Sequence, residues 1–253
     1  DNFRVSGRGE LHLSVLIENM RREGYELAVS RPEVIELTVD GECREPWETL
    51  TVDLDEPYQG AVMSRLAERR GQLTDMQPDG RGRIRLDYRI PARGLIGFRT
   101  EFLSATAGTG LMYHVFERYD TRVGETIGQR SNGALVASVA GKALAYALYN
   151  LQDRGRLFIG HGEEVYEGMI IGIHSRDNDL VVNPTRAKQL TNIRAAGSDE
   201  NIVLTPPVRF SLEQALEFID DDELVEVTPG AIRLRKKILA EGMRRRESRR
   251  RAV

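Results

Sequence analysis

The stretch that most constrains the fold is a tight turn followed by a strictly alternating segment, residues 78–90. The turn reads PDGRG, and its Asp79-Gly80 pair supplies the positive φ that a short hairpin turn requires. After the turn, every second residue is apolar: Ile84, Leu86, Tyr88 and Ile90. Side chains two residues apart share one face of a strand, so the alternation predicts a strand with one apolar and one polar face.

The segments around this strand complete an ordered set of elements. We predict a strand over 48–54, a helix over 59–70, strands over 71–77 and 83–90, a helix over 94–107 and a strand over 110–118. The order βαββαβ is that of the ferredoxin-like split motif, which we expect to form a domain over residues 46–125. With 253 residues, the chain is long enough for two or three domains with cores of their own.

The preceding residues, 1–45, predict only half of an α+β layer. A strand over 2–6 is followed by a helix over 10–23, and then by a strand over 25–39 that bends near Pro32 and a linker over 41–46. The helix has an apolar face made of Leu13, Leu16, Ile17 and Met20. Because the rest of such a layer is missing here, we expect further chain upstream, weak stability and self-association through an open strand edge.

Residues 126–253 predict a glycine-rich, β-rich, barrel-like domain with added helices. Short strands are expected over 134–139, 143–148, 223–227 and 231–234, and within the glycine-punctuated stretch 155–174. Ser211 and Gln214 form a capping box, which predicts a helix over 212–219. A basic helix is expected over 236–250. The whole chain is therefore predicted to be an α+β protein of several domains.

A polar and basic segment, residues 175–196, follows the glycine-rich stretch. Its candidate RNA-contacting residues are Arg176, Asn178, Asn183, Arg186, Lys188, Asn192 and Arg194. One interpretation is a surface loop with one edge strand. The other is a basic finger that becomes ordered on a polyanion, because a connection this long usually has a binding role.

The charge of the chain is strongly segregated, although the net charge is only −3. From Arg233 to Arg251 there are ten Lys and Arg against two Glu, a net of +8, and the candidates there are Arg235, Lys236 and Lys237. From Glu213 to Glu226 there are seven acidic residues and no basic one. Such asymmetry favours a polyanionic partner.

A row of arginines on the alternating strand gives a second candidate surface. Arg83, Arg85 and Arg89 project from the face opposite the apolar residues, Arg81 extends the row, and Arg93 and Arg99 follow. Residues two apart on a strand are separated by about 6–7 Å, which suits successive backbone phosphates. The alternative is an exposed sheet face with cross-strand ion pairs, because Asp75 lies on the neighbouring predicted strand.

Other classes of function find little support in the sequence. No apolar run reaches the ~18 residues of a membrane span, we expect no signal peptide, and Cys43 is alone, which together favour a cytoplasmic protein. The nearest match to a phosphate-binding loop, Gly141-Lys142, lacks its other residues, so we expect no nucleotide cofactor. His161, with its acidic neighbours Glu163 and Glu164, leaves an enzyme or metal site as an alternative, although ordinary hydrogen-bonded histidines are favoured.

The segment SGRGELHLSVLIENMRREGYELAVSRPEVI, residues 6–35, resembles translational GTPases of the elongation factor G type. Four further segments, starting at Arg83, Leu151, Lys188 and Leu216, narrow the resemblance to the BipA or TypA family of ribosome-associated GTPases. They read RIRLDYRIPARGLIGFRTEFLSATAGTG, LQDRGRLFIGHGEEVYEGMIIGIHSRDNDL, KQLTNIRAAGSDE and LEFIDDDELVEVTP. The resemblance covers nearly the whole chain.

The resemblance implies a domain order and a set of partners. Residues 1–45 would be the second half of domain III, 46–125 would be domain V, and 126–253 would be the C-terminal domain of this family. GTP and Mg²⁺ would bind an N-terminal domain outside this sequence, so no catalysis is expected here. Domain V would face large-subunit rRNA of the ribosome, and the segment from Arg176 to Arg194 would approach the acceptor end of an A-site tRNA. The family is linked to stress response, virulence control and ribosome assembly; a stand-alone RNA-binding or RNA-chaperone protein is the alternative.

Overall fold

The alternating segment lies inside an antiparallel sheet in the computed structural model, which describes residues 2–124, 127, 130, 132–187 and 202–251. β5 (Arg83–Pro91) pairs with β3 (Glu42–Asp55) on one side and β4 (Gln72–Pro78) on the other. β6 (Leu111–Thr121) pairs with the remaining side of β3, and β2 (Leu37–Val39) pairs with its first residues. The strands thus follow the order β4-β5-β3-β6 across the sheet.

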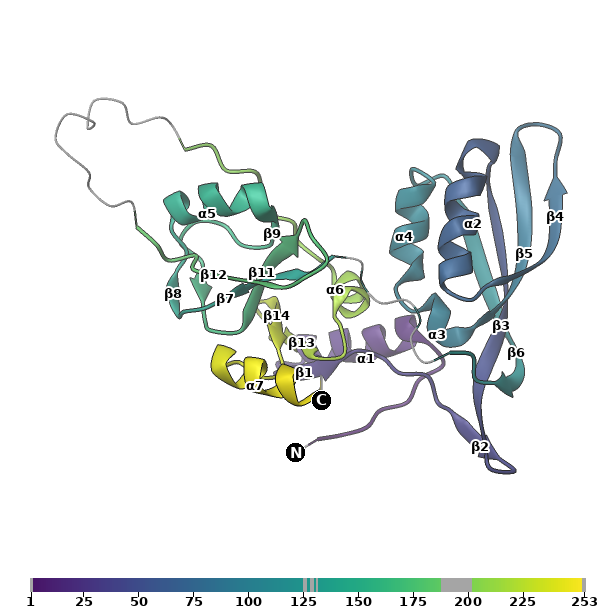
Figure 1. Ribbon diagram of the computed structural model, residues 1–253, viewed down its shortest axis with the longest axis horizontal. Coiled ribbons are helices and arrows are strands. Elements are labelled where there is room, and N and C mark those ends of the chain that lie inside the picture. The colour runs from purple at the N-terminus through teal and green to yellow at the C-terminus, as the bar shows by residue number, and fades with distance from the viewer. Residues whose placement is uncertain (1, 125–126, 128–129, 131, 188–201, 252–253) are drawn as a thin grey trace.

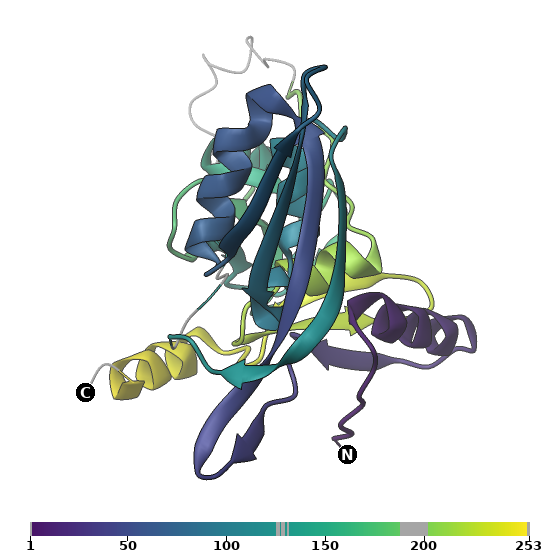
Figure 2. The same ribbon diagram turned by 90° about the vertical axis from the view of Figure 1, so that its right-hand side faces the viewer.

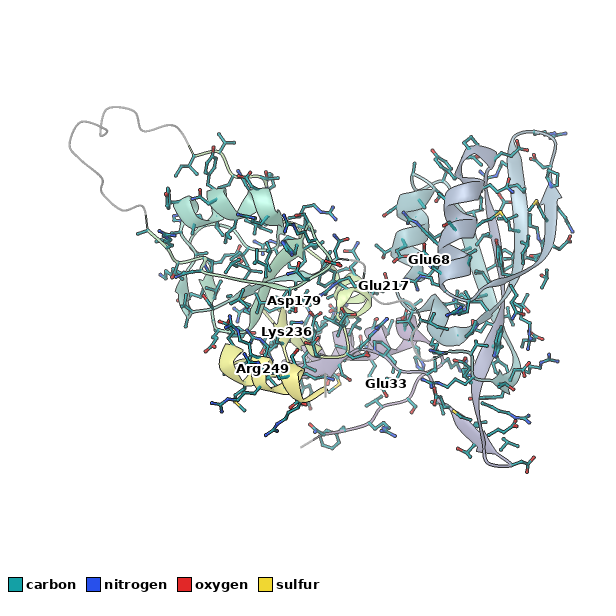
Figure 3. All side chains as sticks on the ribbon, viewed as in Figure 1. Glu33, Glu68, Asp179, Glu217, Lys236 and Arg249 are labelled. Atoms are coloured by element: carbon teal, nitrogen blue, oxygen red, sulfur yellow. The ribbon has the colours of Figure 1, made fainter. Side chains whose placement is uncertain are left out.

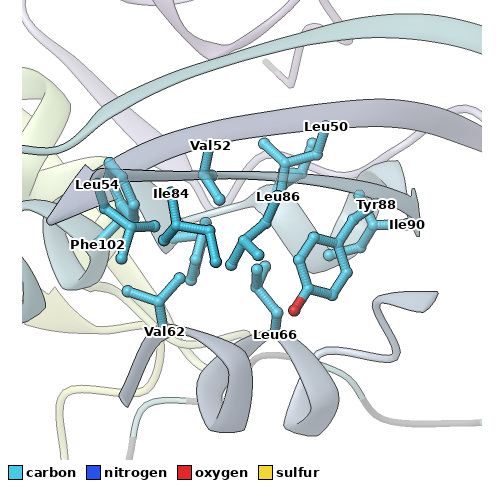
Figure 4. Close-up of a cluster of buried hydrophobic side chains, with 12 residues drawn as sticks. Leu50, Val52, Leu54, Val62, Leu66, Ile84, Leu86, Tyr88, Ile90 and Phe102 are labelled. Carbon is cyan, nitrogen blue, oxygen red and sulfur yellow. The ribbon is translucent and has the colours of Figure 1, made fainter. Parts of the chain in front are cut away.

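Two helices cover one face of this sheet and enclose a core (Figure 2). They are α2 (Gln59–Glu68), which follows the short η1 (Glu56–Tyr58), and α4 (Phe98–Ala105). The four alternating apolar residues of β5 are all buried against them, together with Leu50, Leu66 and Phe102 (Figure 4). The opposite face carries the arginines of β5 and has no described helix over it.

Two predictions for this part of the chain were wrong in detail. The helix predicted over 94–107 is divided into α3 (Ala92–Leu95) and α4, because Gly97 between them takes a left-handed φ of 71°. Residues 41–46 are not a linker. Asp40 and Gly41 have φ of 54° and 82°, which forms a tight turn, and β3 begins directly after it.

A second sheet organises the C-terminal part of the chain. Its strands run in the order β1-β13-β14-β11-β7-β12, and β9 also pairs with β11. These strands are β1 (Leu27–Ser30), β7 (Ala134–Ala137), β9 (Gly155–Leu157), β11 (Met169–His174), β12 (Leu180–Val182), β13 (Glu223–Val227) and β14 (Ile232–Lys236). β8 (Gly141–Lys142) and β10 (Glu164–Val165) form a separate small pair. The two sheets make the molecule a mixed α+β structure with two lobes (Figure 1).

The helices of the C-terminal lobe confirm one prediction and correct two. α6 (Leu212–Phe218) begins with the predicted capping box of Ser211 and Gln214. Residues 145–151 form α5 and the short η2 (Gln152–Arg154) follows, where a strand was predicted over 143–148; a short apolar run does not distinguish the two. The basic helix α7 (Glu241–Arg251) starts later than predicted, because 232–236 complete the hairpin of β13 and β14.

The N-terminal helix α1 (Glu10–Arg22) packs beside α6, and Ile17 is buried in the core of the C-terminal lobe (Figure 1). Leu16, predicted on the same apolar face, is 41% exposed, and residues 2–6 form no strand. The strand predicted over 25–39 is two strands, β1 and β2, which join different sheets. None of the described helices is long and apolar enough to cross a membrane.

Candidate nucleic-acid interface

The arginines of β5 project from the open face of the first sheet, as the alternation predicts, and each has an acidic partner. Arg83 binds Asp53 and Asp55 of β3, the second at 3.1 Å. Arg85 lies 3.3 Å from the carboxylate of Asp87. Asp75, the acid expected to pair with this row, instead accepts hydrogen bonds from residues of its own strand.

Arg89 is the most enclosed member of the row. It pairs with Glu117 at 2.9 Å and with Asp120 at 2.5 Å, and its guanidinium lies 4.5 Å from the ring centre of buried Trp47. Arg89 is also the main reason why the pKa of Asp120 falls to about 2. These contacts favour the alternative interpretation of the row, an ion-paired sheet face, because acidic side chains already neutralise its arginines.

The three outlying arginines of this lobe differ from one another. Arg93 is only 12% exposed and pairs with the fully buried carboxylate of Glu45, so it links α3 to β3. Arg81 lies in the turn between β4 and β5, and Arg99 in the first turn of α4. Both are exposed, and neither forms an ion pair with a residue that the structure describes.

Part of the polar segment after β11 forms a strand. β12 pairs in parallel with β7 at the end of the second sheet. Arg176 and Asn178 are exposed before this strand, and Asn183 and Arg186 are exposed after it, so the structure places these pairs at opposite ends of β12. The described residues match the interpretation as a loop with one edge strand. Lys188, Asn192 and Arg194 lie outside the described residues.

Lys236 is not a surface residue of a basic helix, contrary to prediction. It is the last residue of β14, only 3% exposed, and its Nζ lies 2.6 Å from Asp179, 2.8 Å from Glu223 and 3.0 Å from Asp222 (Figure 3). The buried Glu223 also binds Arg130 through both carboxylate oxygens, at 2.9 and 3.0 Å. Lys236 is therefore part of the lobe's interior and is inaccessible to a phosphate.

The two neighbours of Lys236 are more accessible. Arg235 pairs with Glu226 at 2.7 Å and keeps 19% of its side chain exposed. Lys237 is exposed and hydrogen-bonds the main-chain carbonyl of Asp221. Only Lys237 of the three candidates therefore offers an accessible charge without an acidic partner among the described residues.

Arg154 and Arg156 are candidates that the sequence interpretation missed. Both are exposed, and neither forms an ion pair with a described residue. The main chain brings Arg154 next to Arg176, because the N–H of Ser175 donates to the Arg154 carbonyl at 2.9 Å. Gly155 allows this approach, since a Cβ there would lie 1.8 Å from the carbonyl oxygen of Ile173. The signal in the sequence was the run Arg154-Gly155-Arg156, in which two arginines flank a glycine.

The terminal helix α7 presents a second group of free cations. Arg246, Arg249 and Arg250 are exposed and form no ion pair with described residues, whereas Arg244 hydrogen-bonds the carbonyls that precede the helix and Arg245 pairs with Glu241. Figure 3 shows Arg249 on the outer side of the lobe. A short helix that is polar on all sides is typical of a solvent-exposed segment.

The histidines have ordinary partners. His161 accepts a hydrogen bond from the N–H of Ala145 at 3.1 Å, while Glu163 binds Arg209. His174 is buried and contacts the carbonyl of Asn178 at 2.5 Å. Within the described part of the chain, no group of three or more His, Cys, Asp and Glu residues is arranged to hold a metal ion.

Two families match adjoining parts of this chain. Residues 42–129 match the family described as elongation factor G C-terminus, and residues 132–241 match the TypA/BipA C-terminal domain. A crystal structure of a protein from Thermus thermophilus aligns with 32% of this chain and 12% of that chain, at 23% identity and a TM-score of 0.31. That likeness is too small to support an argument about the fold.

Relatives named large ribosomal subunit assembly factor BipA match almost the whole chain. Those of Escherichia coli strain K12, Haemophilus influenzae and Buchnera aphidicola are 65%, 64% and 56% identical to it over 98% of its length. The chain spans 40–41% of the length of these relatives. The adjoining family matches and the identity over 98% of the chain show that it belongs to the TypA/BipA family and corresponds to the C-terminal part of its members.

Proposed function

We propose that this chain binds the ribosome as part of a large-subunit assembly factor, and that its C-terminal lobe makes most of the contacts with ribosomal RNA. The first part of the proposal is supported by relatives that are named large ribosomal subunit assembly factors and are 65% identical over 98% of the chain. Catalysis would lie elsewhere in such a protein, where a GTPase domain would bind GTP and Mg²⁺. The chain would act in the cytoplasm, and links to stress response and virulence stay predictions from the family resemblance.

The observation that carries the proposed interface is the distribution of unpaired cations. Arg154, Arg156, Arg176 and Arg186 are exposed without acidic partners among the described residues, whereas the arginines of β5 are paired. Phosphate binding depends on cations that are accessible and not already neutralised. The same reasoning includes Lys237 and the exposed arginines of α7, and it leaves out Lys236.

Two finer points belong to the same proposal. The strand order β4-β5-β3-β6, with its helices on one face, supports a ferredoxin-like class for residues 46–125, and residues 126–253 would form a barrel-like domain of their own. The interface would also include Asn178 and Asn183. It would extend through Lys188, Asn192 and Arg194 toward the acceptor end of a tRNA in the A site. Asn side chains can hydrogen-bond unpaired bases and sugar hydroxyls there.

The proposed interface can be tested by co-sedimentation of the 253-residue chain with purified large ribosomal subunits over a series of salt concentrations. Changing Arg154, Arg156 and Arg176 together to Gln should reduce the slope of log affinity against log salt by about 2, since each lost phosphate contact lowers it by about 0.7–0.9. The matched control changes Arg83, Arg85 and Arg89 to Gln and should leave the slope nearly unchanged.

The reverse result would overturn the proposed interface. If the β5 variant lost the salt dependence and the C-terminal variant kept it, the first sheet would carry the RNA contacts. Circular dichroism of both variants checks that their folds are intact. If the unchanged chain failed to sediment with the subunits at low salt, ribosome binding by this chain would itself be rejected.

A further inference from the structure

β6 is an edge strand whose first half lacks the usual protection, whereas its second half has a register shift and the charged residues Glu117, Arg118 and Asp120. It is 11 residues long, it pairs with β3, and no described strand lies along its other side (Figure 2). Its first six residues, LMYHVF, contain no Lys, Arg, Asp, Glu, Gly or Pro. Leu111, Tyr113 and Val115 lie on the open face and are 64%, 53% and 65% exposed. Free edges are normally short, charged, bulged or interrupted by Pro, so an apolar one marks an interaction site.

A groove runs beside the start of this edge. It has a volume of about 550 Å³ and lies between Leu111–Tyr113 of β6 and two residues of α4, Arg99 and Leu103. The side chain of Met112 points to the helix side of the sheet and is half-buried, so apolar surface is available on both sides of the strand. A strand that added to β6 would therefore be covered by α4 on one face.

Of the charged residues that line the groove, some are already ion-paired and one is not. Asp53, which lines it, is bound by Arg83, and Arg85 is bound by Asp87. Arg99 is exposed and forms no ion pair with a described residue. The groove therefore offers one free cation beside a row of main-chain N–H and C=O groups with which no described strand pairs.

We propose that β6 and α4 form a docking groove for an extended, acidic peptide segment of a partner protein, which adds to the sheet as a further strand. The main-chain groups of β6 provide the ladder, Leu103, Leu111 and Tyr113 take alternate apolar side chains, and Arg99 takes a carboxylate. RNA fits the groove less well, because a single free cation would meet a chain of phosphates. The proposal is independent of the ribosomal RNA interface on the other lobe.

The test uses two fluorescein-labelled, end-blocked heptapeptides, TVEVTVT and TVKVTVT, with the 253-residue chain. Fluorescence anisotropy should show the Glu peptide binding about three- to fivefold more tightly than the Lys peptide, as expected for one exposed ion pair. Hydrogen exchange should slow at amides of residues 111–115. Arg99→Glu should reverse the preference, and Arg81→Glu, the same change on the far side of the sheet, should preserve it.

Each remaining outcome would overturn the proposal. Equal binding of both peptides, or no protection of β6 amides at millimolar peptide, would show that the edge recognises no acidic strand. Protection by a uridine heptanucleotide but not by peptide would assign the groove to RNA. Protection that follows protein concentration without any peptide, together with a dimer in sedimentation velocity, would assign the edge to a second copy of this chain.

A further variant tests the edge directly. Val115→Lys, which charges the edge without interrupting it, should weaken peptide binding while thermal unfolding stays unchanged.

Discussion

At the scale of single residues, a buried group of charges around Lys236 holds the C-terminal lobe together. Burial alone would lower the pKa of Lys236, but Glu223 and Asp179 beside it raise the pKa above its ordinary value. The amine therefore stays charged and links β14 to β13 and to the start of β12. Arg130 adds a second cation to Glu223, so the carboxylate at the centre is satisfied from two sides.

Removal of this amine should be costly. Lys236→Met would leave Glu223 and Asp179 with less compensation in a buried site, and breaking such a pair typically costs about 3–5 kcal/mol. Urea unfolding followed by circular dichroism should show that loss. Lys237→Met, the control on an exposed neighbour, should change stability by less than about 0.5 kcal/mol. If both variants unfold at the same urea concentration, the buried cluster contributes little to stability.

Glu10 is the second residue with an unusual environment. It lies in the first turn of α1, and one of its carboxylate oxygens is buried without a hydrogen-bond partner. Its pKa is raised to about 7, first by burial and then by Glu217, whereas His114, Arg31 and the N–H of Gly97 oppose the shift. Figure 3 shows Glu217 between the two lobes. The protonation of Glu10 is thus coupled to the junction of the lobes.

This coupling predicts a pH-dependent stability. The pKa of Glu10 is higher in the folded protein than its ordinary value of 4.5, so its favourable contribution to stability is complete below about pH 4.5 and is lost as the pH rises through 7. Glu10→Gln should therefore be more stable than the unchanged protein at pH 8, by up to about 3 kcal/mol, and similar to it at pH 5. Urea unfolding at both pH values measures the difference. Glu33→Gln, on an exposed glutamate, should show no such change.

At the scale of elements, the capping box of α6 shows how a local sequence signal becomes structure. The N–H of Gln214 donates to Oγ of Ser211, and the side chain of Gln214 accepts from the N–H of Ser211. Leu212, Ala215 and Leu216 are then buried on the face that meets the second sheet. The helix is only seven residues long, so its start depends strongly on this cap.

Loss of the cap should have a moderate and local effect. Ser211→Ala should cost about 1 kcal/mol, the usual value for a capping hydroxyl, and should speed amide exchange at the start of α6. Ser248→Ala within the exposed α7 removes the same hydroxyl without a capping role and serves as the control. Equal losses in the two variants would mean that the box is geometrically present but contributes no stability.

Local signals of this kind account for most of what the sequence predicted. The hairpin turn before β5, the strand alternation and the pairing of β13 with β14 all depend on residues close together in the chain. Two errors were local, at Gly97 and at the turn of Asp40 and Gly41, and the others arose where contacts between distant parts of the chain decide the structure. The residues of α5 are apolar enough for either a strand or a helix, and β12 is a strand only because β7 pairs with it. The arginines of β5 were placed on the correct face, but their acidic partners come from β3 and β6, which sequence spacing does not bring together.

At the scale of the whole molecule, the first 40 residues are divided between the two lobes. β1 pairs with β13 over four residues, and α1 lies against α6, while β2 joins the other sheet. The sequence predicted a separate, weakly stable unit here, and its boundary at residue 45 stays a prediction. The packing of Ile17 with Leu212 and Leu216 gives α1 a place in the core of the C-terminal lobe.

The last prediction tests whether α1 and β1 belong to that core. Ile17 is 8% exposed, so Ile17→Ala should remove buried apolar contacts and leave a cavity, at a cost of about 2–4 kcal/mol. Because β1 pairs with β13, amide exchange at Val225 and Val227 should then speed up, while exchange in β5 stays slow. Leu16→Ala, one residue away and 41% exposed, removes a similar side chain without opening the core and is the matched control. If exchange in β13 is the same in both variants, α1 is only loosely attached to the lobe. The self-association expected for an independent N-terminal unit should then appear in sedimentation velocity as the concentration rises.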